Sequence, residues 1–170
     1  GVPANSRYDA IGELKASPDG SKLAFTTYYN GYTAIFDFDN STGTISNPIS
    51  INIDGSGYGV SFSPNNELLY LGRMDTNTVG GLPDTSQLVQ FDISSGDSAI
   101  IQNSMQVLYT CHNCGFASIK LAPIGKIIVS HYGYYSNFVG DPYLGLINYP
   151  DSTGIGAGYD HQGISLNNQA

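Results

Sequence analysis

Apolar and polar positions along this chain follow a short unit that occurs three times. Each copy contains an apolar strand, a turn with Ser-Pro or Ala-Pro, and a second apolar strand. Apolar side chains recur at every second position of the first strands, which is the period of a half-buried β-strand. Such repetition is typical of stacked or circular arrays, because one unit cannot bury its apolar face alone. The copies occupy residues 14–25, 60–71 and 119–129.

Two further strands are predicted after each copy. The third strand carries an acidic or amide residue near its end, a Gly-containing turn follows, and a weaker fourth strand completes the unit. Four short antiparallel strands joined by turn residues are the pattern of a propeller blade. No stretch shows a helical period. Third strands are expected at residues 34–38, 88–93 and 144–148, and fourth strands at 49–53, 98–102 and 163–166.

The sequence therefore predicts an all-β fold, a β-propeller segment of about three four-stranded antiparallel blades that occupies residues 1–170. We expect blades at approximately 8–57, 58–103 and 115–167, with a cysteine-containing connection at 104–114. Propellers close with roughly four to eight blades, so an arc of three leaves blade faces uncovered. We expect a fragment of a larger ring; the alternatives are a dimer that closes its ring and a polymer built through blade faces.

Composition narrows the class of partner and the location. The formal net charge is −8 with only six Lys plus Arg, which argues against a nucleic-acid partner. No apolar run approaches the roughly 18 residues of a membrane-spanning helix. Only 12% of the residues are charged, whereas the chain has 21 Gly and 13 Tyr. This balance is typical of β-rich secreted and surface proteins, so we predict an extracellular or bacterial cell-surface location.

Three motifs in order carry a resemblance to a known family. IGELKASPDG at residues 11–20, YGVSFSP at 58–64 and LGLINYP at 144–150 resemble the β-propeller repeat regions of large Bacteroidota cell-surface proteins. Those proteins have WD40/YVTN-like blades and are often exported by the type IX secretion system. The likeness covers about residues 7–166 and implies no catalytic residues. The third Pro turn, residues 122–125, departs from the family pattern, and the Cys-containing connection lies outside it.

Long loops are expected to gather at one edge of the blades and tight turns at the other. Loops on a rigid scaffold are the usual place of binding, and Tyr, Asn, Ser and Gly are adaptable contact residues. The long-loop edge thus predicts a non-catalytic binding, adhesion or scaffold module for a protein or glycan ligand. An alternative is that these tyrosines cap the blade ends. The candidate ligand-face residues are Tyr28, Tyr29, Tyr32, Arg73, Asp75, His131, Tyr132, Tyr134 and Tyr135.

Cys111 and Cys114 are the only cysteines of the chain. In an exported protein they are expected to form a short-range disulfide that braces the connection between blades. Incidental free thiols are one alternative. Another is a metal site that adds His112 and His131, although a second paired cluster of ligands is absent.

An acidic turn offers a second, weaker metal interpretation. Asp37, Asp39 and Asn40 precede Gly43, and alternating oxygen ligands of this kind can wrap calcium. A hairpin turn with Gly at positive φ requires the same residues and is favoured. We therefore predict no cofactor, with calcium as the alternative.

Nucleophilic catalysis has little support in the sequence. The Gly-x-Ser-x-Gly elbow is absent, and His112, His131 and His161 are expected in different loops without a carboxylate partner. The chain is therefore predicted not to be an enzyme. One alternative is a fragment of a propeller hydrolase or lactonase-like enzyme with a central metal, and another is a self-assembling structural subunit.

Overall fold

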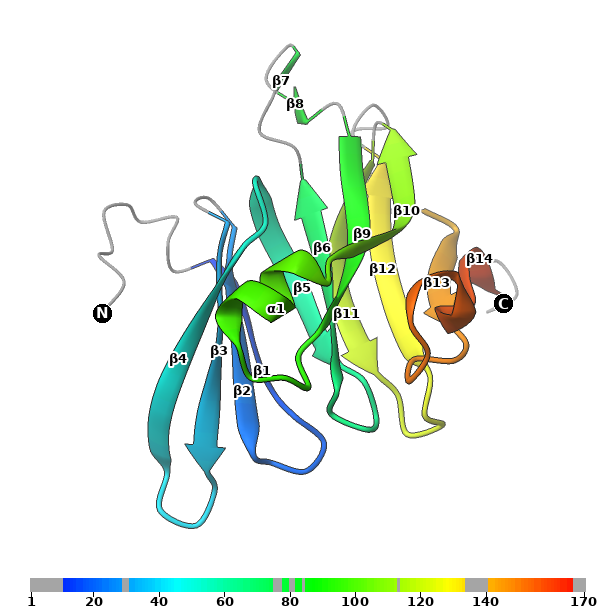
Figure 1. Cartoon of the computed structure of the whole chain (residues 1–170). Helices are drawn as coiled ribbons and strands as arrows, with labels where there is room; N and C mark the ends of the chain where they lie inside the picture. Colours follow the sequence, from blue (N-terminus) through cyan, green and yellow to red (C-terminus); the bar gives the residue numbers. More distant parts are fainter. Residues whose placement is uncertain are drawn as a thin grey trace.

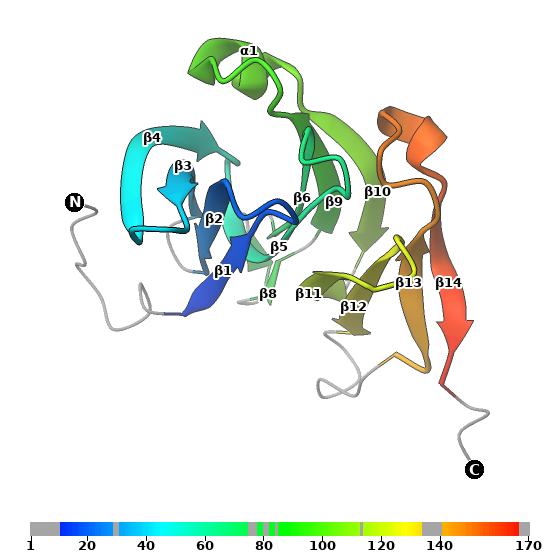
Figure 2. The same ribbon diagram turned by 90° about the horizontal axis from the view of Figure 1, so that it is seen from below.

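Three four-stranded antiparallel sheets make up the molecule, and they fan out from a common centre (Figures 1 and 2). The structure, a computed structural model, describes residues 11–28, 31–74, 78–79, 82–83, 85–112, 114–133 and 141–166. The predicted fold class, an all-β propeller segment of three blades, is confirmed. Among the described residues, no helix has the length and apolar character needed to cross a membrane.

Each sheet is built from strands that are close together in sequence. The first contains β1 (Gly12–Ala16), β2 (Lys22–Thr27), β3 (Tyr32–Asp39) and β4 (Thr44–Asn52). The second contains β5 (Ser56–Phe62), β6 (Leu68–Met74), β9 (Thr85–Asp92) and β10 (Gln106–His112). The third contains β11 (Cys114–Leu121), β12 (Ile127–Gly133), β13 (Tyr143–Ile147) and β14 (Tyr159–Ser165). A two-stranded ribbon, β7 (Thr78–Val79) with β8 (Leu82–Pro83), lies between β6 and β9 in the chain.

The strand order within each sheet runs from the centre of the fan to its rim. Strands β1, β5 and β11 lie innermost, and β4, β10 and β14 lie outermost (Figure 2). The turns β1–β2, β5–β6 and β11–β12 lie at one edge of the sheets, which we call the turn edge (Figure 1). The opposite edge, which carries β7 and β8, we call the loop edge.

The middle sheet is buried on both faces, and this explains its continuous apolar strands. Leu69 and Leu71 of β6 point into a core shared with the first sheet. The alternate residues Leu68 and Tyr70 point into a second core shared with the third sheet. Because side chains alternate across a strand, a sheet between two others needs apolar residues at consecutive positions.

The repeated Ser-Pro turn has a defined hydrogen-bonding role. The Ser17 hydroxyl donates to Asp19 Oδ1 at 2.6 Å and accepts from the Lys22 N–H at 2.9 Å. Ser63 repeats this with Asn65 and the Leu68 N–H, at 2.6 and 2.9 Å. Each buried serine thereby closes its turn and starts the following strand.

One predicted strand is wrong. Residues 98–102 were expected to form the fourth strand of the second blade, but they belong to helix α1 (Ser98–Asn103). Asp97 begins this helix, because its side chain accepts from the N–H groups of Ala99 and Ile100 at 2.9 and 3.0 Å. The fourth strand is β10, within the stretch 104–114 that was expected to be a connection.

Helix α1 packs against the outer part of the first sheet and so connects the second sheet to it. Ile101 is fully buried in the first core. The Gln102 side chain accepts from the Asn52 N–H and donates to the Asn52 carbonyl, both at 2.8 Å. Its amide therefore bonds to the end of β4 as a neighbouring strand would.

Candidate functional site

An apolar pocket of about 300 Å³ lies at the loop edge, where the inner parts of all three sheets meet. The first sheet contributes the residues next to the ends of β1 and β2, the second contributes β5, and the third contributes β11 and β12. None of the described lining side chains is charged. They are Ile11, Tyr28, Tyr58, Phe116, Ala117 and Tyr132.

Backbone pairing positions the aromatic rings of this pocket, which we call the aromatic pocket. The Tyr28 N–H donates to the Ile11 carbonyl at 2.8 Å, which holds Tyr28 beside the start of β1. The Tyr28 and Tyr58 rings meet edge to face, with centroids 6.3 Å apart and an angle of 80°. Tyr132 extends from β12, and its hydroxyl lies 3.7 Å from Met74 Sδ of the second sheet. Side chains from three sheets thus form a concave surface for a neutral ligand with an apolar face.

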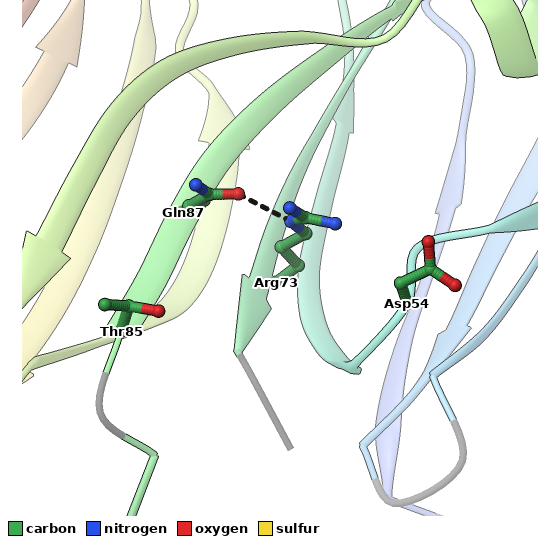
Figure 3. A pocket seen from close by; sticks show the side chains of 4 residues that line it. All are labelled: Asp54, Arg73, Thr85 and Gln87. Atoms are coloured by element: carbon green, nitrogen blue, oxygen red, sulfur yellow. Dashed lines mark hydrogen bonds between the residues drawn. The ribbon is translucent and has the colours of Figure 1, made fainter. Parts of the chain in front are cut away.

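A second pocket of about 200 Å³ on the same edge is polar (Figure 3). It is lined by Asp54, Arg73, Thr85 and Gln87. Arg73 donates from Nε to Gln87 Oε1 and from Nη1 to the Ile53 carbonyl, both at 2.8 Å. These bonds fix the guanidinium, which lies between Gln87 and Asp54 in Figure 3. Arg73 therefore ties β6 to β9 and to the segment that follows β4.

The predicted ligand-face residues that the structure describes do not line a single pocket. Tyr28 and Tyr132 share the aromatic pocket, whereas Arg73 lines the polar pocket. Tyr32 lies near Ser50 on β4, with the two hydroxyl oxygens 3.4 Å apart. The remaining described residue of the set, His131, is 5% exposed and lies inside the protein. Tyr29, Asp75, Tyr134 and Tyr135 lie outside the described residues.

Sequence reasoning missed Tyr58 and Phe116 as pocket residues. Both sit beside glycines in inner strands, Tyr58 next to Gly59 and Phe116 next to Gly115. A Cβ at Gly59 would collide with the Ala117 carbonyl oxygen, so β5 and β11 approach closely there. Aromatic residues next to strand glycines were the available signal for this junction.

The histidines differ most from the sequence-based expectation. His131 lies in β12 and His161 in β14, not in loops, and their rings stack with centroids 4.1 Å apart. His131 Nδ1 lies 3.5 Å from Asp141 Oδ2, so a carboxylate partner is present. Tyr109 of β10 stacks on the other side of His161 at 4.5 Å. We call His131, Asp141 and His161 the His–Asp cluster.

Burial sets the protonation of the groups around this cluster. It lowers the pKa of His161, and the neighbouring His131 lowers it further, so the neutral ring is favoured. Burial also raises the pKa of Tyr159, whose hydroxyl lies 3.1 Å from His161 Nδ1. His131 Nδ1 is buried and has no hydrogen-bond partner among the residues that the structure describes.

The two cysteines form the expected disulfide. Cys111 lies near the end of β10 and Cys114 begins β11, so the bond spans the crossing from the second sheet to the third. Both residues are buried and belong to the second core. The pairing leaves no thiolate for the metal site that was considered with His112 and His131.

The acidic turn has the hydrogen bonds of a hairpin. Asp39 Oδ1 accepts from the Ser41 hydroxyl at 2.6 Å and from the Ser41 and Thr42 N–H groups, which lowers the pKa of Asp39 to about 2. Asp37 bonds to Asn47 and Lys22, which hold its pKa below the ordinary value. Asn40 lies in the turn after β3. These carboxylates stabilise the turn, and a calcium ion here stays an untested alternative.

Comparison with known proteins finds similarity at the level of structure. No family model and no curated protein matches this chain. A TolB-like protein from Agrobacterium tumefaciens is 15% identical with a TM-score of 0.50, and the match covers 85% of this chain and 48% of that one. Hydrazine synthase from Kuenenia stuttgartiensis is 18% identical with a TM-score of 0.51, and the match covers 79% of this chain and 38% of that one. The chain therefore spans less than half the length of these proteins, and the likeness establishes the propeller fold alone.

Proposed function

We propose that this propeller segment is a non-catalytic recognition module that binds neutral glycans in the aromatic pocket. The observation that carries the proposal is that all three sheets contribute uncharged, largely aromatic side chains to one concave surface. Tyrosine rings offer flat apolar faces to the C–H groups of a sugar, and their hydroxyls can bond to its oxygens.

The size of the pocket favours a glycan over a protein ligand. At about 300 Å³ it lies at the lower end of small-molecule pockets, so it suits one sugar ring at the end of a chain. A protein partner would need a much larger surface, on the order of 800 Å² on each side. The lining residues that the structure describes carry no charge, which favours a neutral ligand.

The test is calorimetric titration of the protein with a panel of neutral oligosaccharides. We expect millimolar or tighter binding of at least one, weakened at least tenfold by Tyr58→Ala and by Tyr132→Ala. Tyr149→Ala is the matched control, because Tyr149 is 66% exposed at the turn edge and should leave binding unchanged. Ala117→Trp fills the pocket without removing a core side chain and should also abolish binding.

Two results would refute this function. One is the absence of binding to every oligosaccharide at millimolar concentration. The other is binding that survives Ala117→Trp in a variant whose circular dichroism matches the wild type. If the protein captures a defined protein ligand and the Ala117→Trp variant still binds it, the binding site lies in another part of the loop edge.

The hydrolase alternative has a separate test. It requires groups that can donate or accept protons beside the bound ligand, and among its described residues the aromatic pocket offers only tyrosine hydroxyls. We expect no turnover in a panel of ester, lactone and glycoside substrates, with or without added zinc. Turnover that a chelator abolishes would favour the enzyme.

We further propose that the uncovered sheet faces pack against additional blades of the same protein. Leu14 of β1 is 62% exposed, although the strand lies at the centre of the fan. The match covers less than half of each of the propeller proteins that it resembles. The isolated chain should then be an 18.1 kDa monomer that binds hydrophobic dyes. A stable dimer in light scattering would favour ring closure by two copies, and larger species would favour the self-assembling subunit.

An extracellular or cell-surface location is part of the same proposal, including an origin in Bacteroidota and export by the type IX system. The Cys111–Cys114 disulfide supports an oxidising compartment. Alkylation of thiols before cell lysis, followed by mass spectrometry, should recover the bonded peptide. Recovery of both cysteines in alkylated form would contradict export.

A further inference from the structure

We propose that the His–Asp cluster, His131, Asp141 and His161, binds a divalent transition metal ion, with zinc as the preferred ion. One ligand atom from each residue lies within 4.8 Å of the other two. Two imidazole nitrogens and one carboxylate oxygen, with water in a fourth position, are a common zinc coordination set. The inference is independent of the glycan pocket, which shares none of these residues.

The fold brings these residues together from three places in the third sheet. His131 and His161 lie on β12 and β14, the two neighbours of β13, and Asp141 precedes β13. Gly145 of β13 has no side chain, and a Cβ there would lie 2.5 Å from the Tyr159 hydroxyl. The missing side chain leaves room for Tyr159 beside His161.

Hydrogen bonds fix which nitrogen of His131 faces the carboxylate. Nε2 of His131 lies 3.1 Å from the His161 carbonyl oxygen, and a carbonyl can only accept, so Nε2 carries the hydrogen. In the neutral ring, Nδ1 then presents a lone pair toward Asp141. A ring nitrogen whose opposite N–H donates to a backbone carbonyl is the usual arrangement of a metal-bound histidine.

The distance between the facing atoms of His131 and Asp141 matches the distance between two ligands of one metal ion. Their facing atoms, Nδ1 and Oδ2, lie 3.5 Å apart. A direct charge-assisted hydrogen bond would bring them to about 2.7–2.9 Å. Two ligands that are each about 2.1 Å from a tetrahedral zinc ion lie about 3.4 Å apart.

A positive charge between these two atoms would also resolve an unfavourable contact. The His131 side chain is 1% exposed, and its Nδ1 makes no hydrogen bond. Without a cation, a buried lone pair faces the lone pairs of a carboxylate, which is repulsive. Either a second proton on His131 or a metal ion can supply that charge, and the 3.5 Å separation favours the metal.

His161 is also prepared as a ligand. When its Nδ1–H donates to the Tyr159 hydroxyl at 3.1 Å, Nε2 keeps a free lone pair. The His161 ring stacks on the His131 ring and on the Tyr109 ring, with centroid distances of 4.1 and 4.5 Å, and these contacts hold it in place. Asp141 is 32% exposed, which gives an ion access from solvent.

The experiment is calorimetric titration with zinc chloride of protein that has first been treated with EDTA, without reductant so that the disulfide stays intact. We expect one zinc ion per chain, micromolar or tighter, and a rise in melting temperature with zinc. Calcium and magnesium should give neither effect. Cobalt should give the visible absorption of a tetrahedral site.

Conservative variants test the assignment of ligands. Asp141→Asn and His161→Gln should each weaken zinc binding at least tenfold and remove the thermal shift. His112→Gln and Asp54→Asn are the matched controls, because both residues are exposed and lie outside the cluster. They should bind zinc as the wild type does. Asp141→Asn changes a partly exposed residue, so it keeps the test valid if a histidine variant fails to fold.

Three outcomes would overturn the proposal. The first is the absence of stoichiometric zinc binding by the folded wild type. The second is binding that Asp141→Asn and His161→Gln leave unchanged. The third is an NMR titration that shows His131 charged and paired with Asp141 in the presence of excess zinc, because a proton would then occupy the place of the metal.

Discussion

Glu13 accepts a hydrogen bond from the Ser118 hydroxyl at 2.7 Å, although 105 residues separate the two positions. Its second carboxylate oxygen accepts from the Val60 N–H at 3.3 Å. Glu13 lies in β1, Val60 in β5 and Ser118 in β11, so one side chain bonds to the inner strands of both other sheets. Lys15 Nζ lies 3.4 Å from the same carboxylate. This side chain therefore links the three sheets at their centre.

Glu13→Ala should lower the free energy of unfolding by about 1.5 to 3 kcal/mol, because hydrogen bonds to a charged group are lost and the partners are left unpaired. Urea denaturation followed by circular dichroism measures the change. Glu67→Ala is the control, since Glu67 is exposed in a turn and should cost only about 0.5 kcal/mol. Equal effects of the two substitutions would show that Glu13 does not link the sheets.

Gln90→Leu should be among the most damaging polar substitutions. Gln90 is 2% exposed; its Oε1 accepts from the Gly154 N–H at 2.8 Å, and its Nε2 donates to Tyr70 Oη and the Ser152 carbonyl. Leucine has a similar size but leaves the Gly154 and Ser152 groups unpaired, so we expect a loss of about 2 to 4 kcal/mol in chemical denaturation. The same change at the exposed Gln162 should be nearly neutral. A small effect at Gln90 would mean that water replaces these bonds.

Gly72→Ala tests the close contact between the second and third sheets. A Cβ at Gly72 would lie 2.6 Å from the Cβ of Phe116, closer than carbon atoms pack. We expect a loss of about 1 to 3 kcal/mol, as in other overpacked cores. Gly156→Ala is the control, because the nearest atom there, Ser152 Cβ, is at an ordinary 3.4 Å. Equal melting temperatures for the two variants would contradict the packing described here.

The paired substitution Cys111→Ala and Cys114→Ala should lower the free energy of unfolding by about 2 kcal/mol. This is the loop-closure contribution expected for a disulfide loop of this length. The reductant dependence of unfolding supplies an internal control. A thiol reductant should destabilise the wild type by a similar amount and leave the double variant unchanged. An unreduced wild type no more stable than the double variant would show that the disulfide contributes nothing.

Alkaline pH should weaken the contact between the second and third sheets through Tyr70. Burial raises the pKa of Tyr70 to about 12, with a further rise from Asp151 and an opposing effect of the Gln90 hydrogen bond. The raised pKa favours the neutral form of Tyr70 in the folded state. The contribution of this group to the free energy of unfolding is therefore complete below about pH 10 and is lost between about pH 10 and 12. The free energy of unfolding is expected to fall by on the order of 2 kcal/mol over this range.

Tyr70→Phe provides the comparison for that pH dependence. The variant should be less stable at neutral pH, because the 2.7 Å bond to the Pro150 carbonyl is lost. Its stability should then fall less steeply than that of the wild type in urea unfolding between pH 9 and 11.5. Parallel slopes for the two proteins would show that Tyr70 does not titrate in this way.

The sequence predicted the sheets better than the connections between them. Alternating apolar residues and the Ser-Pro turns determine the first three strands of each unit locally. Residues 98–103 are too few to show a helical period, so the helix was recognisable only from its N-cap, Asp97. Ile101 is buried while Ile100 is 58% exposed, an alternation that also fits a strand.

Residues of the aromatic pocket were predicted only where loop composition pointed to them. Tyr28 and Tyr132 were selected from Tyr-rich loops, and both line the aromatic pocket. The contacts between strands of different sheets depend on register and tilt, which one sequence does not specify. His131 and His161 are 30 residues apart and meet across β13, so their proximity could be found only in the folded chain.

Gln102 has a consequence for aggregation. The outermost strand of an open sheet presents unpaired N–H and C=O groups, which can recruit a strand from another molecule. At Asn52, near the open rim, both groups are already bonded to the Gln102 amide. This end of β4 is therefore closed to strand addition and to the cross-β growth that could follow. The faces of the sheets are not closed by this contact, so they stay open to the further blades proposed above.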